Sequence, residues 1–499
     1  MFESDKLQLN YSFAKDHGLI LLTLEDEAEI GMLDNAKFSS LLEARRVLRR
    51  PLKIRPLSLS EFNQEISQIY SLGNMDSKKL NDELVEENNL NYLAEGLPEP
   101  SDLLDSADDA PVIRLINGLI TEGVKCKASD IHIEPFDKKL IVRLRLDGIL
   151  KEILSLSHTV SSRLVSRIKV MARLDIAERR IPQDGRISLA IGDKSLDVRV
   201  STLPSQYGER VVLRLLDKAD QQLNINQLGM SKKLNNQFQE SLLEPNGIVL
   251  VAGPTGSGKT TSLYAGITFL NDQSRNILTV EDPVEYALLG IGQTQVNTKV
   301  GMDFATGLRA ILRQDPDVVM VGEIRDRETA EIAIQASLTG HLVLSTIHTN
   351  SAVSVVTRLK DMGIEPFLLS STIKAIISQR LVRKLCDFCK KPSKVTSAEY
   401  KIIETVDDSI KETFAANGCD KCGFTGFSGR FGIYEAVFVN ENIKKMIHND
   451  SSEKEISDYA FKKSNKLIHS GIQSVVDGYT SLDEVLRICR EEVSDHEYI

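Results

Sequence analysis

GPTGSGKT, residues Gly253 to Thr260, is the stretch that decides the fold of this chain. It follows the apolar run Ile248–Val251 and leads into TSLYA (261–265), which is typical of the first turns of a helix. A strand, a glycine-rich loop and a helix in this order, with the spacing GxxxxGK[ST], predict a phosphate-binding P-loop. An ordinary glycine–serine turn would explain neither the spacing nor the strand before it.

The residue types of this loop indicate how it would bind a nucleoside triphosphate, although P-loops serve kinases, helicases, GTPases and motors alike. Its glycines let backbone N–H groups turn towards a β-phosphate, and the start of the helix adds a partial positive charge. Lys259 would reach the β- and γ-phosphates, and the Thr260 hydroxyl would bind Mg²⁺. The expected nucleotide-binding residues are Gly253, Pro254, Thr255, Gly256, Ser257, Gly258, Lys259 and Thr260.

Acidic residues follow two further apolar strands. NILTV (276–280) precedes Glu281, and DVVMV (317–321) precedes Gly322 and Glu323. Ligands of open parallel sheets bind at the carboxyl ends of the strands, where a carboxylate can activate an attacking water or hold Mg²⁺. We therefore expect Glu281 and Glu323 to be catalytic. Each acid alone could merely cap a turn, but the order of the three segments favours the catalytic interpretation.

Two histidines flank a fourth predicted strand in GHLVLSTIHT (340–349). An isolated histidine is more often a packed or surface residue. His348, however, follows the end of a strand that should neighbour the nucleotide, where an imidazole could sense the γ-phosphate. His348 and His341 are both candidates for the catalytic site.

Four of the six cysteines form two CxxC pairs, Cys386 with Cys389 and Cys419 with Cys422. Paired CxxC units predict one Zn²⁺ bound by four thiolates, and four protein ligands leave no open position for catalysis. Since the pairs lie further apart than in common zinc ribbons, we expect residues 384–430 to be an insertion closed by the metal. Disulfides are disfavoured in a reducing compartment, and redox activity of a CxxC pair is a further alternative.

The composition of the 499 residues indicates a globular protein of about two to four domains. We expect no membrane span and no signal peptide, because no apolar run approaches about 18 residues and the N-terminus is polar. A net charge of −10 argues against nucleic acid as a partner. One basic stretch stands out as either a solvated face or a docking surface for an acidic partner: Arg45, Arg46, Arg49, Arg50, Lys53 and Arg55.

The chain divides into four segments by pattern. Residues 1–82 mix strand-like and helical runs, and residues 83–110 have the acidic composition of a linker. Residues 111–225 begin with a helix and continue with strands that alternate apolar and charged residues. Residues 226–499 alternate strands and helices, as in a parallel sheet covered by helices. The predicted class is therefore α/β, with a P-loop ATPase domain after two smaller α/β or α+β domains.

These segments together resemble the secretion ATPase superfamily, and most closely the type II secretion assembly ATPases of the general secretion pathway protein E family. The resemblance runs from about residue 108 to the C-terminus, whereas the first 80 or so residues carry no motif that we can match. It rests on LTVEDPVEY (278–286), RAILRQDPDVVMVGEIRD (309–326), QASLTGHLVLSTIHTN (335–350), the CxxC pairs, DDAPVIRLINGLI (108–120), ASDIHIEP (128–135), VRLRLDGIL (142–150) and AERRIPQDGRI (177–187).

The resemblance implies a homo-hexamer in which ATP binds between the second N-terminal domain and a RecA-like C-terminal domain. Lys259 and Thr260 would belong to Walker A, Glu281 to the aspartate box and Glu323 to Walker B. His341 and His348 would form the histidine box. Arg199 and Arg214 would be presented to the nucleotide, and the cysteines would form the zinc insertion. For any arginine, including Arg309, Arg313 and Arg325, a surface ion pair is the alternative.

The resemblance also implies partners and a location. The chain would be a cytoplasmic protein attached peripherally to the inner membrane. Its N-terminal domain would bind the cytoplasmic part of a bitopic membrane protein, and we expect no cyclic-dinucleotide regulation there. ATP-driven domain rotation would move a polytopic platform protein, extend a pseudopilus and export folded proteins across the outer membrane. A type IV pilus extension ATPase is the alternative motor. A scaffold that binds ATP without turnover is the alternative of a different class.

Overall fold

The computed structural model describes residues 17–62, 110–217 and 224–489, apart from gaps at 25–26, 34–35, 37, 49, 59–60, 192–193, 273 and 463–465. The expected linker at 83–110 lies outside the described residues except for Ala110, as does Arg49 of the basic stretch. The chain divides into two compact units, one made of residues 1–144 and 151–217 and the other of residues 145–150 and 218–499.

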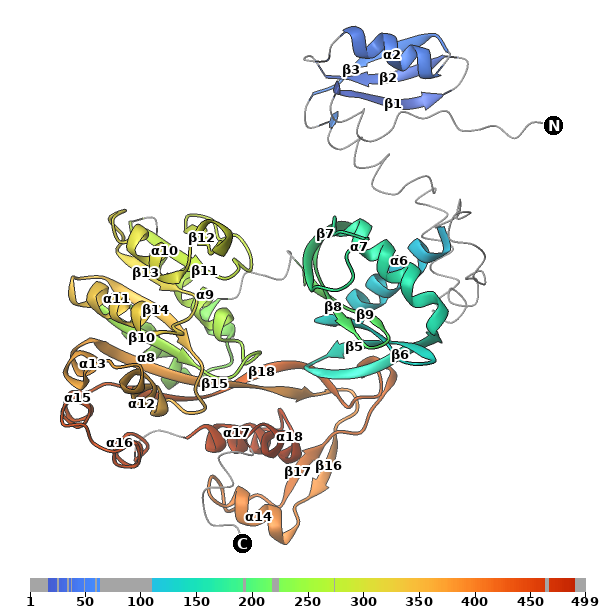
Figure 1. The fold of residues 1–499 in the computed structure, drawn as a ribbon. Coiled ribbons are helices and arrows are strands. Elements are labelled where there is room, and N and C mark those ends of the chain that lie inside the picture. Colours follow the sequence, from blue (N-terminus) through green and yellow to red (C-terminus); the bar gives the residue numbers. More distant parts are fainter. Residues whose placement is uncertain are drawn as a thin grey trace. The chain divides into compact units, whose positions relative to one another are not determined.

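The P-loop strand lies inside a seven-stranded sheet (Figure 1). In spatial order its strands are β12 (Gly292–Gln295), β11 (Ile277–Glu281), β13 (Val318–Val321), β14 (Leu342–Ile347), β10 (Gly247–Ala252), β15 (Ile373–Leu385) and β18 (Phe427–Phe438). All neighbours pair in parallel except β18, which is antiparallel to β15. The carboxyl ends of β10, β11, β13 and β14 therefore meet at one edge.

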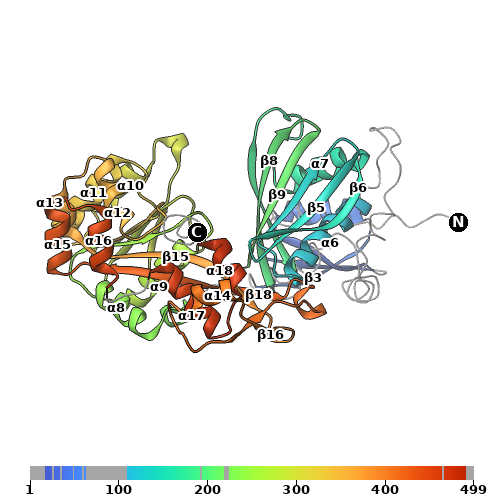
Figure 2. The same ribbon diagram turned by 90° about the horizontal axis from the view of Figure 1, so that it is seen from below.

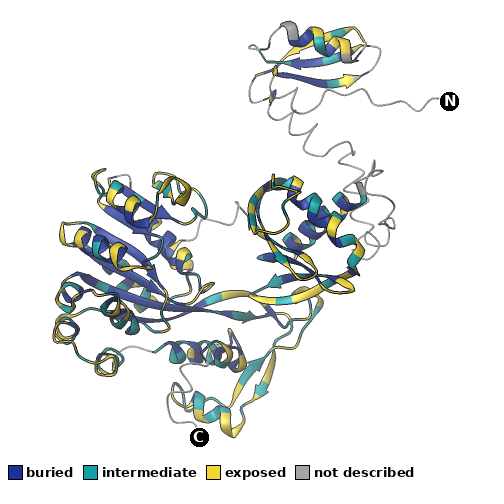
Figure 3. Cartoon of the chain, viewed as in Figure 1, coloured by how far each residue is buried: buried dark blue, intermediate teal, exposed yellow. Residues whose placement is uncertain are grey.

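Helices cover both faces of this sheet, which explains why its central strands are continuous apolar runs (Figure 3). Ile248 and Leu250 of β10 pack into one core, and Val249 and Val251 pack into the other. The first core is covered by α10 (Phe304–Ile311), α11 (Arg327–Leu338), α12 (Ser354–Asp361), α13 (Pro366–Thr372), α15 (Glu441–His448) and α16 (Glu453–Ala460). The second is covered by α8 (Lys232–Leu242) and α9 (Lys259–Leu270).

The long strands β15 and β18 continue past the sheet and carry the cysteine-containing insertion between them (Figure 2). The insertion contains the hairpin of β16 (Lys391–Lys394) and β17 (Glu412–Ala415), with α14 (Ser397–Ile403) between its strands. Helices α17 (Leu467–Val476) and α18 (Leu482–Ile488) pack against β15 and β18 through a third apolar core that includes Val382 and Ile433.

The other compact unit contains a six-stranded sheet with two helices. Its spatial order is β6 (Ile149–Ser157), β5 (Lys139–Leu146), β4 (Asp130–Pro135), β9 (Gly208–Asp217), β8 (Lys194–Ser205) and β7 (Gln183–Ile191). The helices are α6 (Ala110–Lys125) and α7 (Ser161–Met171), the latter preceded by the 3-10 turn η1 (His158–Val160). Alternate residues of β5 are buried, as its apolar–charged alternation predicted.

The N-terminal segment forms a small α/β module, as expected. β1 (Leu19–Leu24) pairs antiparallel with β2 (Ala28–Met32), which pairs in parallel with the edge strand β3 (Leu52–Pro56). Helix α2 (Phe38–Leu48) supplies Leu41, Ala44 and Leu48 to the core that it shares with this sheet. The parallel crossover through α2 is the connection that two parallel neighbouring strands need.

Candidate active site

The P-loop packs directly against β15, and this contact requires glycine at two positions. Gly253 and Gly258 have φ values of 146° and 86°, which L-residues rarely adopt. A Cβ at Gly253 would lie 2.7 Å from the Gln379 carbonyl oxygen, and one at Gly258 would lie 2.9 Å from Gln379 Nε2. A side chain at either position would therefore collide with Gln379.

Lys259 is the first residue of α9, and its side chain folds back over the loop. Its ammonium group donates hydrogen bonds to the carbonyl oxygens of Gly253 (2.9 Å) and Pro254 (3.0 Å). Burial lowers the pKa of Lys259 to about 8, an effect that Glu323 opposes and Arg380 strengthens. Lys259 therefore still carries its charge at neutral pH, beside the loop that would hold the phosphates. Thr260, next in the helix, is exposed.

Glu323 and His348 come together because their strands are neighbours. Glu323 follows β13, His348 follows β14, and His348 Nε2 lies 3.3 Å from Glu323 Oε2. The other carboxylate oxygen of Glu323 forms an ion pair with Arg325. Glu323 also acts on the pKa of Lys259, so these charged groups share one site. The structure thus assembles three of the residues predicted from sequence: Lys259, Glu323 and His348.

Glu281 lies at the carboxyl end of β11, as predicted, but its carboxylate is enclosed. It is only 2% exposed and accepts hydrogen bonds from Thr279 Oγ1 (2.5 Å), Gln293 Nε2 (3.1 Å) and the Tyr264 hydroxyl. Burial and this bond raise the pKa of Tyr264. These contacts tie α9 to β11 and β12. A direct catalytic role for Glu281 stays a prediction. Its contacts show a structural role, in which the carboxylate joins the helix to the two strands.

His341 lies at the other end of β14 from His348. It immediately precedes the strand, and its Nδ1 lies 2.9 Å from the carbonyl oxygen of Ala336, the last turn of α11. A strand of this length separates its ends by roughly 17–20 Å. Within one chain, His341 therefore does not join the group around Glu323, and its predicted catalytic role has no support from this placement.

Arg199 and Arg214 are direct partners across β8 and β9, and Arg186 is the partner of Arg199 on β7. Directly opposed residues of antiparallel strands share a face, so these three arginines form a row. Arg214 Nε donates to Asp130 Oδ1 at 2.9 Å. Burial acts to raise the pKa of Asp130, but its hydrogen bonds from Arg214 and Ser129 outweigh burial and lower it. Of the other arginines, Arg309 forms an exposed ion pair with Glu328.

The four cysteines predicted as metal ligands converge. Their sulfur atoms all lie within 4.8 Å of one another, with Cys386–Cys419, Cys389–Cys422 and Cys419–Cys422 at 3.9, 3.8 and 3.7 Å. Four sulfurs at about 2.3 Å from a central Zn²⁺ in a tetrahedron would be about 3.8 Å apart. The backbone N–H groups of Cys419 and Gly426 also point at Cys422 Sγ, each at 3.2 Å. The cluster is compatible with zinc in spacing and in donor type.

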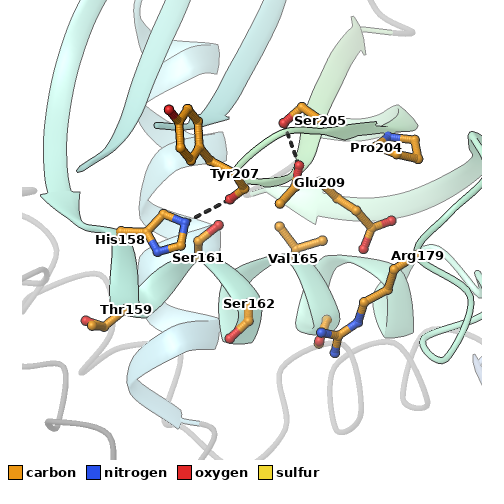
Figure 4. Close-up of a pocket in the computed structure, with 12 residues that line it drawn as sticks. His158, Thr159, Ser161, Ser162, Val165, Arg179, Pro204, Ser205, Tyr207 and Glu209 are labelled. Atoms are coloured by element: carbon orange, nitrogen blue, oxygen red, sulfur yellow. Dashed lines mark hydrogen bonds between the residues drawn. The ribbon is translucent and has the colours of Figure 1, made fainter. Parts of the chain in front are cut away.

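A cavity of about 250 Å³ lies in the other unit, between η1, the start of α7 and the β8–β9 turn (Figure 4). Half of its twelve lining residues carry a hydroxyl group, and Arg179 and the buried Glu209 also line it. Glu209 forms an ion pair with the buried Lys169 at 2.5 Å. His158 Nε2 lies 2.8 Å from the carbonyl oxygen of Tyr207 and closes one side. None of the predicted site residues lines this cavity.

A glycine loop between a central parallel strand and a helix, with Lys259 at the helix start and Glu323 at the end of another parallel strand, defines a RecA-like P-loop ATPase. The family model described as Type II/IV secretion system protein matches residues 105–487. A second model, described as an N-terminal domain of GSPII protein E, matches residues 8–70, where we could match no motif from sequence. The chain belongs to the type II/IV secretion system protein family and is a secretion ATPase.

The relatives that this chain matches over nearly their full length are type II secretion system proteins. The chain is 53% identical to the type II secretion system protein E of Pseudomonas aeruginosa over 97% of both chains. It is 50% identical to the protein of that name from Aeromonas hydrophila and 49% identical to the type II secretion system ATPase E of Vibrio cholerae, again over 97% of each chain. The predicted relation to the type II secretion ATPases is confirmed.

Solved structures support the fold. The Legionella pneumophila ATPase DotB matches with a TM-score of 0.57 at 20% identity, over 77% of this chain and 96% of DotB. The pilus retraction motor PilT, solved with ADP, matches with a TM-score of 0.50 at 25% identity, over 74% of this chain and 95% of PilT. Among the described residues, no helix has the length and apolar character needed to cross a bilayer.

Proposed function

We propose that this chain hydrolyses ATP at the P-loop and Glu323 to drive the type II secretion machine. The observation that supports this most is the grouping of Lys259, Glu323 and His348 at one edge of a parallel sheet. Lys259 would bind the β- and γ-phosphates, and the exposed Thr260 would hold Mg²⁺, which supplies positive charge to the phosphates. Glu323 would orient and deprotonate the attacking water.

His348 and Arg325 would adjust the charge of Glu323. Both contact its carboxylate, and their side chains are 46% and 60% exposed. Arg325 is thus accessible to a phosphate, and His348 can donate a hydrogen bond to whichever group carries negative charge. We propose that the γ-phosphate competes with Glu323 for these donors. Loss of the γ-phosphate would then return both donors to Glu323, giving the site two electrostatic states.

We further propose a homo-hexamer in which the arginine row of Arg186, Arg199 and Arg214 completes the nucleotide site. A row of cations on one sheet face suits the charge that spreads over phosphate oxygens in the transition state. By the family resemblance, the unit that carries the row would close over the nucleotide. Repeated closure would move the polytopic platform protein and extend a pseudopilus, so that folded proteins leave across the outer membrane. Zinc at the four cysteines would hold the insertion together.

A strain that carries Glu323→Gln in place of the native residue tests the secretory role. We expect extracellular proteins that depend on the machine to fall by at least about tenfold, as in a deletion strain, because a motor without turnover supplies no work. Surface pili should be unchanged in both strains. Loss of pili with normal secretion would establish the pilus-extension alternative. Normal secretion by the Glu323→Gln strain would favour a scaffold that needs no turnover and would overturn the proposal.

The N-terminal module would attach the chain to the inner membrane through the cytoplasmic domain of a bitopic protein. Its edge strand β3 is exposed over Lys53, Ile54 and Arg55, and Arg50 precedes it. Lys53 lies 3.8 Å from Glu29, whereas among the described residues Arg50 and Arg55 have no carboxylate within 4 Å. Exposed arginines at a sheet edge favour an acidic partner, through charge attraction and strand addition.

Reversing both charges, Arg50→Glu with Arg55→Glu, should weaken binding to that cytoplasmic domain by about tenfold at low salt. The measurement is a titration of the full chain with the purified domain at two salt concentrations. The double reversal Lys138→Glu with Lys139→Glu, at the exposed start of β5 in the six-stranded sheet, is the matched control and should change nothing. Equal affinity in all three proteins would contradict this docking surface.

A further inference from the structure

A buried guanidinium group lies behind the first glycine of the P-loop. It belongs to Arg380 of β15, the parallel neighbour of the P-loop strand, in which Ser378 is the register partner of Ala252. Gln379 and Arg380 therefore continue β15 alongside the start of the loop. Arg380 is 8% exposed, although arginine is seldom buried without an acidic partner. Gln379 and Arg380 are thus two large polar side chains buried side by side in sequence, and both need an explanation.

Gln379 accounts for one of them, because its amide group clamps the loop. Its Nε2 donates to the Ser257 carbonyl oxygen at 2.6 Å, and its Oε1 accepts from Ser262 Oγ at 2.7 Å. The clamp joins β15 to the P-loop and to the first turn of α9, and Gln379 is 1% exposed. Both polar atoms of the Gln379 amide thus have a partner, and these bonds explain its burial.

Arg380 donates only to uncharged oxygens. Its Nη1 lies 3.3 Å from the Gln379 carbonyl oxygen, and its Nη2 lies 3.0 Å from the Asn350 carbonyl oxygen. Among the described residues, none of its contacts is an ion pair with a carboxylate. The carboxylate that its charge affects is Glu435, whose two oxygens already accept the backbone N–H groups of Ala352 (2.5 Å) and Leu467 (3.1 Å).

The charge of Arg380 acts directly on the nucleotide site. The same Gln379 carbonyl that accepts from Arg380 would lie 2.7 Å from a Cβ at Gly253, and Gly253 accepts from the Lys259 ammonium. Both cations therefore lie near Gly253. Lys259 donates to the Gly253 carbonyl oxygen, and Arg380 donates to the Gln379 carbonyl oxygen, which packs against Gly253. Two buried cations this close repel each other, and neither is neutralised by an ion pair with an acid among the described residues. An anion that binds beside both groups would relieve this repulsion.

We propose that Arg380 is a second cationic residue of the nucleotide site, which adds to Lys259 a fixed charge that favours the triphosphate over the diphosphate. The proposal rests on the proposed function, since it assigns a further role within that site. Through Asn350, two residues after His348, Arg380 also supports the strand end that carries His348. Its electrostatic effect is expected to grow with the negative charge of the ligand.

Two substitutions separate this charge from structural support. Arg380→Gln removes the charge but keeps an N–H donor for the Asn350 carbonyl oxygen. Arg380→Lys keeps the charge but loses the planar guanidinium group and its fixed N–H donors. Affinities of the full chain for Mg²⁺ with ATPγS and with ADP are measured by titration. We expect Arg380→Gln to weaken ATPγS binding about tenfold and ADP binding about threefold. Arg380→Lys should keep the wild-type ratio of the two affinities.

Lys374→Met is the matched control, because Lys374 lies at the amino end of the same strand in an ion pair with Glu244 at 3.1 Å. It should bind both nucleotides like the wild type. Equal weakening of ATPγS and ADP by both Arg380 variants would reduce Arg380 to structural support and overturn the proposal, as would unchanged affinities. If Arg380→Gln does not fold, a lower ATPγS-to-ADP preference in Arg380→Lys than in the wild type would also overturn it. Failure of the wild-type chain to bind ATPγS would instead contradict the proposed function.

Discussion

Replacement of Glu323 by glutamine is expected to lower kcat for ATP hydrolysis by about 10²–10⁴-fold. The amide cannot accept a proton from water, but it has nearly the shape of the carboxylate, so the contacts with Arg325 and His348 can persist as hydrogen bonds. ATP binding should remain within a few fold, since Lys259 and the loop are untouched. The measurement is phosphate release by the full chain at saturating ATP, together with a binding titration.

The control for this substitution is Glu331→Gln on α11. Glu331 is exposed and forms an i,i+4 ion pair with Arg327, so its replacement removes the same charge away from the P-loop. Exposed pairs of this kind contribute little to stability. We expect Glu331→Gln to hydrolyse ATP like the wild type. Hydrolysis by Glu323→Gln within about twofold of the wild type would mean that another group activates the water.

Loss of one cysteine ligand is expected to have the largest effect on stability. Cys419→Ser should abolish retention of zinc, of which the wild type should hold about one per chain, and destabilise the 384–430 insertion by several kcal/mol. The metal would hold the two CxxC pairs together, and without it only the long segment between Cys389 and Cys419 connects them. Zinc content by elemental analysis and thermal unfolding of the full chain test this expectation.

Cys126→Ser is the matched control, because Cys126 is exposed and lies in the other unit. It should retain zinc and unfold at the wild-type temperature. Two findings would contradict the zinc site: a wild-type chain with reduced cysteines and no metal, or a Cys419→Ser chain that still holds one zinc ion. A chelator should reproduce the effect of Cys419→Ser on the wild type, since zinc binding and folding of the insertion are linked.

The features that could be predicted from sequence are those set by local spacing or by strand order. The P-loop is a continuous segment, and each CxxC pair is a local turn. Glu323 and His348 meet because each follows a parallel strand, and parallel neighbours end at the same edge. Elements and class could therefore be read from periodicity and motifs, and the family resemblance supplied the identity of the second domain.

The features that could not be predicted depend on contacts between distant segments. Gln379 clamps Ser257 and Ser262 from a strand more than a hundred positions away, with separations of 122 and 117. Its only signal in the sequence is the polar stretch Ser378-Gln379-Arg380 between the apolar segments Ala375–Ile377 and Leu381–Val382. The enclosure of Glu281 depends on Tyr264 and Gln293, neither of which belongs to a nucleotide motif.

The placement of His341 also depends on the fold rather than on proximity in sequence. It is close to His348 in sequence and belongs to the same box by resemblance, but a β-strand is extended. The six residues of β14 carry the two histidines to opposite ends of the sheet. His348 follows the end of β14 that lies beside Glu323, whereas His341 precedes the other end. The direction of this strand in the sheet, rather than the shared sequence segment, therefore decides which histidine can reach Glu323.

The most direct test of the proposed mechanism is single-turnover hydrolysis by the full chain. Radiolabelled ATP and Mg²⁺ are bound in the presence of excess protein, and the conversion to ADP is followed with time for the wild type and for Glu323→Gln. The mechanism predicts that the wild type converts its bound ATP to ADP, while Glu323→Gln retains ATP at least about a hundred times longer. Conversion of bound ATP at equal rates in the two proteins would contradict it.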